Sequence, residues 1–141
     1  MQVETILQSK GRSVVTVAAE ATIADAVDVL NTHHIGAVVV LDDGEIAGML
    51  SERDIVRRLG TDWSALAMRT VREVMTRPVI TAAPAESIDD VMERMTEKRI
   101  RHMPIVEAGK LVGIVSIGDV VKRKIEVTEF EATALKEYIA S

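Results

Sequence analysis

The chain has 141 residues, of which 48% are hydrophobic, and this is enough apolar material for one folded domain with a sizeable core. Its net charge of −5 and its single Trp, Tyr and Phe argue against nucleic acid as a partner, since nucleic-acid binders usually present a basic face or aromatic stacking platforms. The sequence has no cysteine for disulfides or thiolate metal sites, no apolar run of the roughly 18 residues that a membrane span needs, and no signal-peptide pattern, so we expect a cytoplasmic protein.

The first half of the chain predicts the order strand, helix, strand, strand, helix. Thr22 and Asp25 have the spacing of a capping box at the start of a helix, and Asp42-Asp43-Gly44 between two apolar runs is typical of a hairpin turn. Ser51 is placed to cap the second helix. The expected elements are a strand over 14–17, a helix from 22 to about 34, strands over 37–41 and 46–50, and a helix from 51 to about 59.

The second half predicts the same order, followed by an additional helix. Pro104 lies inside an expected strand and therefore indicates an edge position or an irregular start. The apolar stripe of the last helix must pack on its own subunit or on a second chain. The expected elements are short helical pieces over 63–68 and 70–75, a strand over 79–81, a helix over 87–98, strands over 103–106 and 111–115, and helices over 119–124 and 126–139.

The two halves are copies of one unit at a constant offset of 65 residues. The segment Gly48-Met-Leu-Ser51-Glu-Arg-Asp54 returns as Gly113-Ile-Val-Ser116-Ile-Gly-Asp119, and the copies align without a gap from residue 22 to 58. Two copies are too few for a solenoid and instead suggest one compact pair with two related clefts. We divide the chain into a first repeat over 1–62, a second over 63–125, and a C-terminal helix over 126–141.

These repeated segments, with Ile100-Arg-His-Met-Pro-Ile-Val106, resemble a pair of cystathionine-β-synthase (CBS) domains over about residues 1–125. The resemblance implies an α/β (α+β) fold in which two pseudo-symmetric β-α-β-β-α repeats pack as one module and often dimerise into a flat disc. Members of the family are regulatory. Many bind an adenosine-containing ligand (AMP, ADP, ATP, NAD or S-adenosylmethionine) in the clefts between the repeats.

Ser51 with Asp54, and Ser116 with Asp119, each lie where a strand becomes a helix. One interpretation is structural, because a Ser N-cap and a carboxylate in the first turn both stabilise a helix start. In the other, which the resemblance favours, the carboxylate accepts hydrogen bonds from both hydroxyls of a ribose. The two roles are compatible. The resemblance also implies that further residues line the base and ribose region, namely Thr16, Ile80, Thr81, Ala82, Met103 and Pro104.

The copies differ most at the start of their second strand, where Gly36-Ala37 in the first corresponds to Arg101-His102 in the second. The resemblance implies that basic residues here reach ligand phosphates, and Lys122 is placed to assist. A guanidinium suits a phosphate, and the charge of a His depends on pH. For the first cleft we expect Arg53 to serve instead. We therefore predict two unequal sites, the second favouring a phosphorylated ligand.

We expect no metal site and no enzymatic activity. His33 and His34 are adjacent on a helix and point about 100° apart, so a surface pair explains them better than metal ligation. No catalytic triad order, P-loop or dinucleotide fingerprint is present. The main hypothesis is a stand-alone module that binds an adenosine nucleotide or dinucleotide and signals to an unidentified effector protein. The alternative is a structural dimerisation module with degenerate, ligand-free clefts. Both predict a homodimer.

Overall fold

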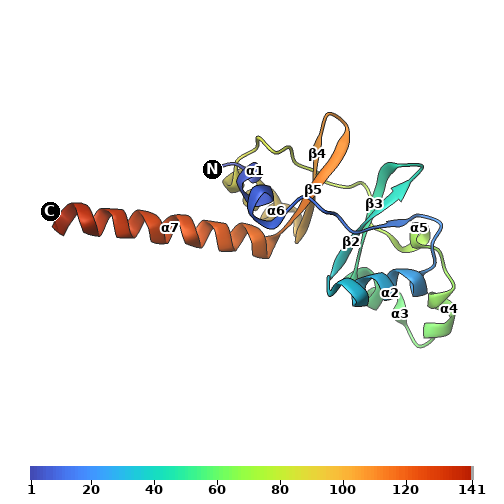
Figure 1. Ribbon diagram of the computed structural model, residues 1–141. Helices are drawn as coiled ribbons and strands as arrows, with labels where there is room; N and C mark the ends of the chain where they lie inside the picture. Colours follow the sequence, from blue (N-terminus) through green and yellow to red (C-terminus); the bar gives the residue numbers. More distant parts are fainter. Residues whose placement is uncertain (141) are drawn as a thin grey trace.

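The computed structural model describes residues 1–140 and shows two similar halves, with one long helix extending away from them (Figure 1). The first half contains a three-stranded sheet and the second a two-stranded sheet. In chain order the elements are α1 (Val3–Lys10), β1 (Thr16–Ala18), α2 (Ile23–His33), β2 (Ala37–Asp42), β3 (Glu45–Ser51), α3 (Glu52–Leu59), α4 (Trp63–Ala67), α5 (Val71–Val74), α6 (Ile88–Lys98), β4 (His102–Glu107), β5 (Lys110–Ser116) and α7 (Ile117–Ala140).

The first repeat has the predicted order of elements. β1 pairs in parallel with β2, and β2 pairs antiparallel with β3. Asp43 and Gly44 join β2 to β3 with φ of 52° and 81°, which is the left-handed geometry of a two-residue hairpin turn. The capping box at the start of α2 is confirmed, since the Asp25 amide donates to the Thr22 hydroxyl and the Thr22 amide donates to the Asp25 carboxylate.

In the second repeat, our expectation of a strand over 79–81 is wrong. Only Ala82 bridges to β4: its amide donates to the Pro104 carbonyl, and its carbonyl accepts from the Val106 amide. In the first repeat the Val39 amide donates to Val15 and the Ala19 amide to Leu41, which extends the pairing. The positions 65 residues later are Pro104 and Pro84. Because proline has no N–H, neither of these bonds can form, and the pairing is limited to one residue.

The helix preceding each repeat packs on the other repeat. The sequence analysis did not predict α1, whose Val3, Ile6 and Leu7 belong to the core of the second repeat. The Val3 amide donates to the Glu86 carbonyl, as the Val71 amide of α5 donates to Ala21 in the first repeat. α4 and α5, which follow residue 62, contribute Leu66, Val71 and Val74 to the core of the first repeat, so segments on both sides of that boundary pack together.

The glycine of each repeated segment permits this packing. A Cβ on Gly48 would lie 2.6 Å from Sδ of Met75 and 2.9 Å from the carbonyl oxygen of Thr76. A Cβ on Gly113 would lie 2.6 Å from a methyl of Leu7. These distances are shorter than ordinary van der Waals contact. A side chain at Gly48 would therefore push Met75 and Thr76 away from the sheet, and one at Gly113 would push α1 away.

The last two predicted helices form one continuous helix, α7, so the expected break near residue 125 is wrong. No proline or glycine lies between Asp119 and Ala140, and the helix has no reason to stop. Val120 is fully buried near its start, whereas the residues beyond Val127 are exposed. Figure 1 shows this part projecting from the second repeat. None of the described helices is both long and apolar enough to cross a membrane.

Candidate functional site

Asp54 lies in the first turn of α3 and completes a capping box with Ser51. Its Oδ2 accepts hydrogen bonds from the Ser51 amide at 2.9 Å and the Ser51 hydroxyl at 3.0 Å. Its Oδ1 accepts one from the Thr76 hydroxyl at 2.9 Å. Since an ionised carboxylate has about four acceptor positions, one is left. The capping role is thus confirmed, and the second carboxylate oxygen faces the segment that connects the repeats.

Asp119 has the same place at the start of α7 but a different partner. Its Oδ2 accepts from the Ser116 amide at 2.8 Å and from Nζ of Lys10 at 2.7 Å. Lys10 also donates to the Ile114 carbonyl at 3.0 Å. Burial acts to raise the pKa of Asp119, but the hydrogen bonds from the Lys10 ammonium and the Ser116 amide outweigh it and hold this pKa below its usual range. The second carboxylate is therefore neutralised by the chain's own lysine.

The partners differ because α1 and α5, the helices that precede one repeat and pack on the other, have different lengths. Pro78 disfavours helical backbone at Arg77, so α5 ends at Val74 and Thr76 pairs in extended form with Met49. α1 meets no such signal and continues to Lys10, where Gly11 follows at φ 98°. About one extra turn of helix places a lysine where the first repeat has a threonine hydroxyl.

Asp54 lines a cavity of about 530 Å³ between the two repeats, a volume typical of small-molecule sites. Our expectation that Arg101 and His102 serve a different cleft from Asp54 is wrong, since both line this cavity. Residues at the starts of both β2 and β4 line it, and a Cβ on Gly36 would lie 2.5 Å from Oε1 of Glu52. The lining residues are Gly36, Ala37, Met49, Ser51, Glu52, Arg53, Asp54, Arg57, Thr76, Pro78, Val79, Ile80, Lys98, Arg99, Ile100, Arg101 and His102.

The cavity is rich in positive charge that is not neutralised within the chain. Five cationic side chains line it against two carboxylates, Glu52 and Asp54. Among the described residues, no ion pair or side-chain hydrogen bond involves any of the five, whereas other arginines such as Arg72 and Arg94 hold carboxylates. The five are Arg53, Arg57, Lys98, Arg99 and Arg101. Such a cavity attracts anions.

His102 adds a titratable group to the wall of the cavity. Burial lowers the pKa of His102, and the nearby charges of Lys10 and Arg101 lower it further against the opposing effect of Asp119. The lowered pKa favours the neutral imidazole, which can donate one hydrogen bond and accept one.

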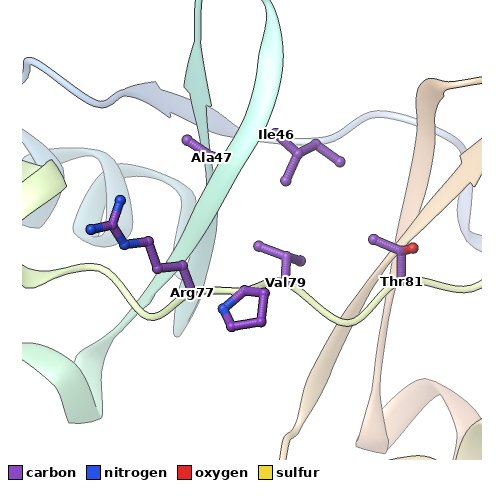
Figure 2. A pocket seen from close by; sticks show the side chains of 6 residues that line it. Ile46, Ala47, Arg77, Val79 and Thr81 are labelled. Carbon is purple, nitrogen blue, oxygen red and sulfur yellow. The ribbon is translucent and has the colours of Figure 1, made fainter.

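A second, more open hollow of about 640 Å³ lies between β3 and the connecting segment (Figure 2). The side chain of Ile46 in β3 faces Val79 across it, whereas the Ala47 methyl points away, and Arg77 lies at its edge. Pro78 and Val79 line both spaces. The lining is mainly aliphatic, and only Thr81 of the predicted site residues contributes to it.

The structure brings together some predicted site residues and separates others. The positively charged cavity of about 530 Å³ is lined by Ser51, Arg53, Asp54, Ile80, Arg101 and His102. Thr16 lies in β1, and Ala82, Met103 and Pro104 are buried in or beside the second core. Ser116 and Asp119 lie with Lys10 at the start of α7, and Lys122 is exposed on that helix. Whether any of them contacts a ligand remains a prediction.

The sequence analysis missed several lining residues. Arg57 follows Arg53 by one helical turn, so its position on the same face of α3 was readable from spacing. Lys98 and Arg99 end α6, and Arg99 has the left-handed conformation at its C-cap. Only the packing of the second repeat against the first brings these two to Asp54.

Comparison with known proteins identifies the family. The sequence pattern of the CBS domain matches residues 9–61 and 71–126. A CBS domain-containing protein of Arabidopsis thaliana, CBSX3, named as mitochondrial, is 33% identical over 95% of this chain and 69% of its own. The expected cytoplasmic location therefore stays a prediction.

Solved structures agree. The CBS-domain protein ATU1752 from Agrobacterium tumefaciens superposes with a TM-score of 0.83 at 43% identity, over 87% of this chain and 92% of that one. The CBS domain pair of protein MJ0100, in complex with 5'-methylthioadenosine and S-adenosyl-L-methionine, has a TM-score of 0.77 at 29% identity over 91% and 98% of the chains. With two matched repeats over most of its length, this chain belongs to the CBS domain family and is a tandem CBS pair.

Proposed function

We propose that this CBS pair is a regulatory module that binds a phosphorylated adenosine ligand, of the AMP, ATP or NAD type, in the cavity at Asp54. One observation carries the proposal: a carboxylate with an open acceptor position lies in the same inter-repeat cavity as five cationic side chains that have no ion-pair partner within residues 1–140. A carboxylate suits a ribose diol, and guanidinium groups suit phosphates. The complex of MJ0100 with adenosyl ligands supports the nucleoside part.

Each part of the ligand has a counterpart in the cavity. Asp54 accepts hydrogen bonds from the ribose, and the Thr76 hydroxyl gives way because it occupies one oxygen of that carboxylate. The adenine contacts aliphatic side chains such as Met49 and Ile80, since the lining has no aromatic residue. The phosphates lie toward Arg101 and the end of α6. We do not assign a catalytic role, because the lining contains no activated nucleophile.

Calorimetric titration with AMP, ATP, NAD and S-adenosylmethionine tests the proposal. Asp54→Asn is expected to weaken binding at least tenfold, because a hydrogen bond to a charged group contributes about 1.5–3 kcal/mol. Asp25→Asn is the matched control, since Asp25 has the same capping role on α2 and does not line the cavity. The absence of heat and of a thermal shift with all four ligands would remove the proposal.

Regulation requires that binding change what a partner protein recognises. The cavity is built from both repeats, so a ligand that contacts Asp54 and Arg101 together favours one relative packing of the repeats over others. We propose an effector protein that distinguishes these packings. An Asp54→Ala/Asp119→Ala double variant separates this from a purely structural dimerisation module. We expect capture of the effector to change with nucleotide concentration in the wild type but not in the double variant. Capture that does not change with nucleotide in the wild type either would favour the structural role.

A further inference from the structure

The projecting part of α7 carries an apolar seam that is exposed along most of its length. Val121, Ile125, Leu135 and Ile139 are 42%, 51%, 59% and 74% exposed. With Thr128 and Ala132 they form a row with alternating spacings of four and three residues, from 121 to 139. This is the seven-residue repeat of a helix that packs against another helix along one seam.

The residues beside the seam have a charge pattern that specifies a partner. One flank carries Lys124 and Glu131, and the other carries Glu129 and Lys136, in the positions next to the seam. In a parallel, in-register pair these flanks meet across the interface with a shift of five residues. Lys124 then faces Glu129 of a second copy, and Glu131 faces Lys136. Symmetry gives each contact twice, so all four pairings are attractive.

We propose that α7 pairs with the α7 of a second copy of this chain in a parallel two-stranded coiled coil. The seam places Ile125 and Ile139 at one repeat position and Leu135 at the other, the arrangement that favours two parallel strands. The inference concerns a different surface from the ligand cavity and does not depend on ligand binding. It also explains how a helix with a long exposed segment is stabilised, because isolated helices of this length are marginal in water.

An antiparallel pairing fits the charges less well. If residue 121 faced residue 139 of the partner, Glu129 and Glu131 would each face their own copies, and Lys136 would face another lysine. The seam is short, and Thr128 and Ala132 at its centre contribute little apolar area, so we expect modest affinity. Phe130 lies on the opposite face of α7 and takes no part in the seam. Nζ of Lys124 lies 2.9 Å from Asp89 in an exposed ion pair, which competes with the ion pair that we propose between Lys124 and Glu129 of a second copy.

Cysteine cross-linking tests the direction of pairing, because the chain has no cysteine of its own. Under mild oxidation, full-length Ile139→Cys is expected to form a disulfide dimer, since residues at this seam position face their own copies in a parallel pair. Phe130→Cys is the matched control on the opposite face and is expected to stay monomeric on denaturing gels. Efficient cross-linking in a mixture of Val121→Cys and Ile139→Cys, with none in Ile139→Cys alone, would establish antiparallel pairing and overturn the proposal.

Charge reversal tests the pairing itself in the Ile139→Cys background. Glu131→Lys and Lys136→Glu each convert two attractive contacts into repulsive ones, so dimerisation is expected to weaken on the order of fivefold. The double reversal restores attraction and is expected to recover the wild-type yield. A loss of folding is excluded by an unchanged thermal transition of the two repeats. Single reversals that cross-link as well as the parent, or a double reversal that does not recover, would refute the proposal.

Discussion

Gly48→Ala tests how closely the segment of Met75 and Thr76 must approach the sheet of the first repeat. The new methyl would lie 2.6 Å from Sδ of Met75 and 2.9 Å from the Thr76 carbonyl oxygen, against about 3.5–4.0 Å for an ordinary contact. The methionine can rotate, but the carbonyl is held by the Met49 amide at 3.0 Å. At Gly113 the methyl meets only the side chain of Leu7, which is buried but can adjust more readily than a hydrogen-bonded carbonyl. Overpacking costs about 1–3 kcal/mol, and we place Gly48 at the upper and Gly113 at the lower end.

The alanine also reduces the entropy of the unfolded chain, which offsets about 0.4–1 kcal/mol in both variants. We therefore expect Gly48→Ala to lose about 2 kcal/mol and Gly113→Ala less than 1 kcal/mol. Urea and thermal unfolding measure this, and Tm should fall by roughly 8 °C and at most 4 °C respectively. Gly48→Ala should also weaken nucleotide binding, because it displaces the backbone of Thr76, which lines the cavity. Equal losses in the two variants would show that backbone contact at Thr76 does not decide the cost.

Three further predictions follow from the charges around the cleft. Lys10→Met should raise the pKa of Asp119 toward its ordinary value, which NMR titration of the carboxyl carbon can detect; an unchanged pKa would mean that Lys10 does not hold Asp119 in solution. Burial lowers the pKa of His102 below its ordinary 6.5, so between the folded and the unfolded pKa the unfolded chain binds more protons than the folded one. The free energy of unfolding should therefore fall as the pH drops below about 6.5. Urea titrations at pH 7.5 and 5.5 measure this loss, and His102→Gln should remove the part that comes from His102. Arg101→Gln should weaken ATP binding about tenfold or more but leave adenosine unaffected, whereas Arg58→Gln, one residue beyond the cavity wall, should change neither; a loss for adenosine as well would place Arg101 on the nucleoside.

The features that could be predicted from the sequence depend on local chemistry. A hydroxyl three residues before an acid, just ahead of an apolar run with helical spacing, favours a helix start, and Thr22 with Asp25 and Ser51 with Asp54 both begin helices. The hairpin at Asp43-Gly44 needs left-handed backbone at two adjacent positions, which these residue types tolerate. The repeat at a fixed offset then implied that two such units pack together, and this established the fold class.

The features that could not be predicted depend on which segments meet in space. α1 reads as an unremarkable N-terminal segment, because the surface that buries Val3 and Leu7 lies about 80 to 110 residues away in the sequence. The placement of Arg101 beside Asp54 has the same cause. The sequence shows that the two repeats differ at this position, but it does not show that the basic residues of one repeat point into the cleft that contains the acid of the other.

The different partners of Asp54 and Asp119 trace to the lengths of α5 and α1. α5 and α1 begin in equivalent positions, because the amide of Val71 donates to the Ala21 carbonyl and the amide of Val3 donates to the Glu86 carbonyl. The two segments differ only after their first helical turn. Pro78 stops one helix there, and the other continues to Lys10. The first acid consequently keeps a hydroxyl partner that a ribose can replace, while the second is paired with an ammonium that a ribose would have to displace or share. On the proposed function, an ion pair with this partial exposure opposes a competing ribose by up to about 1 kcal/mol, so we expect a ligand to bind at Asp54 before it binds at Asp119.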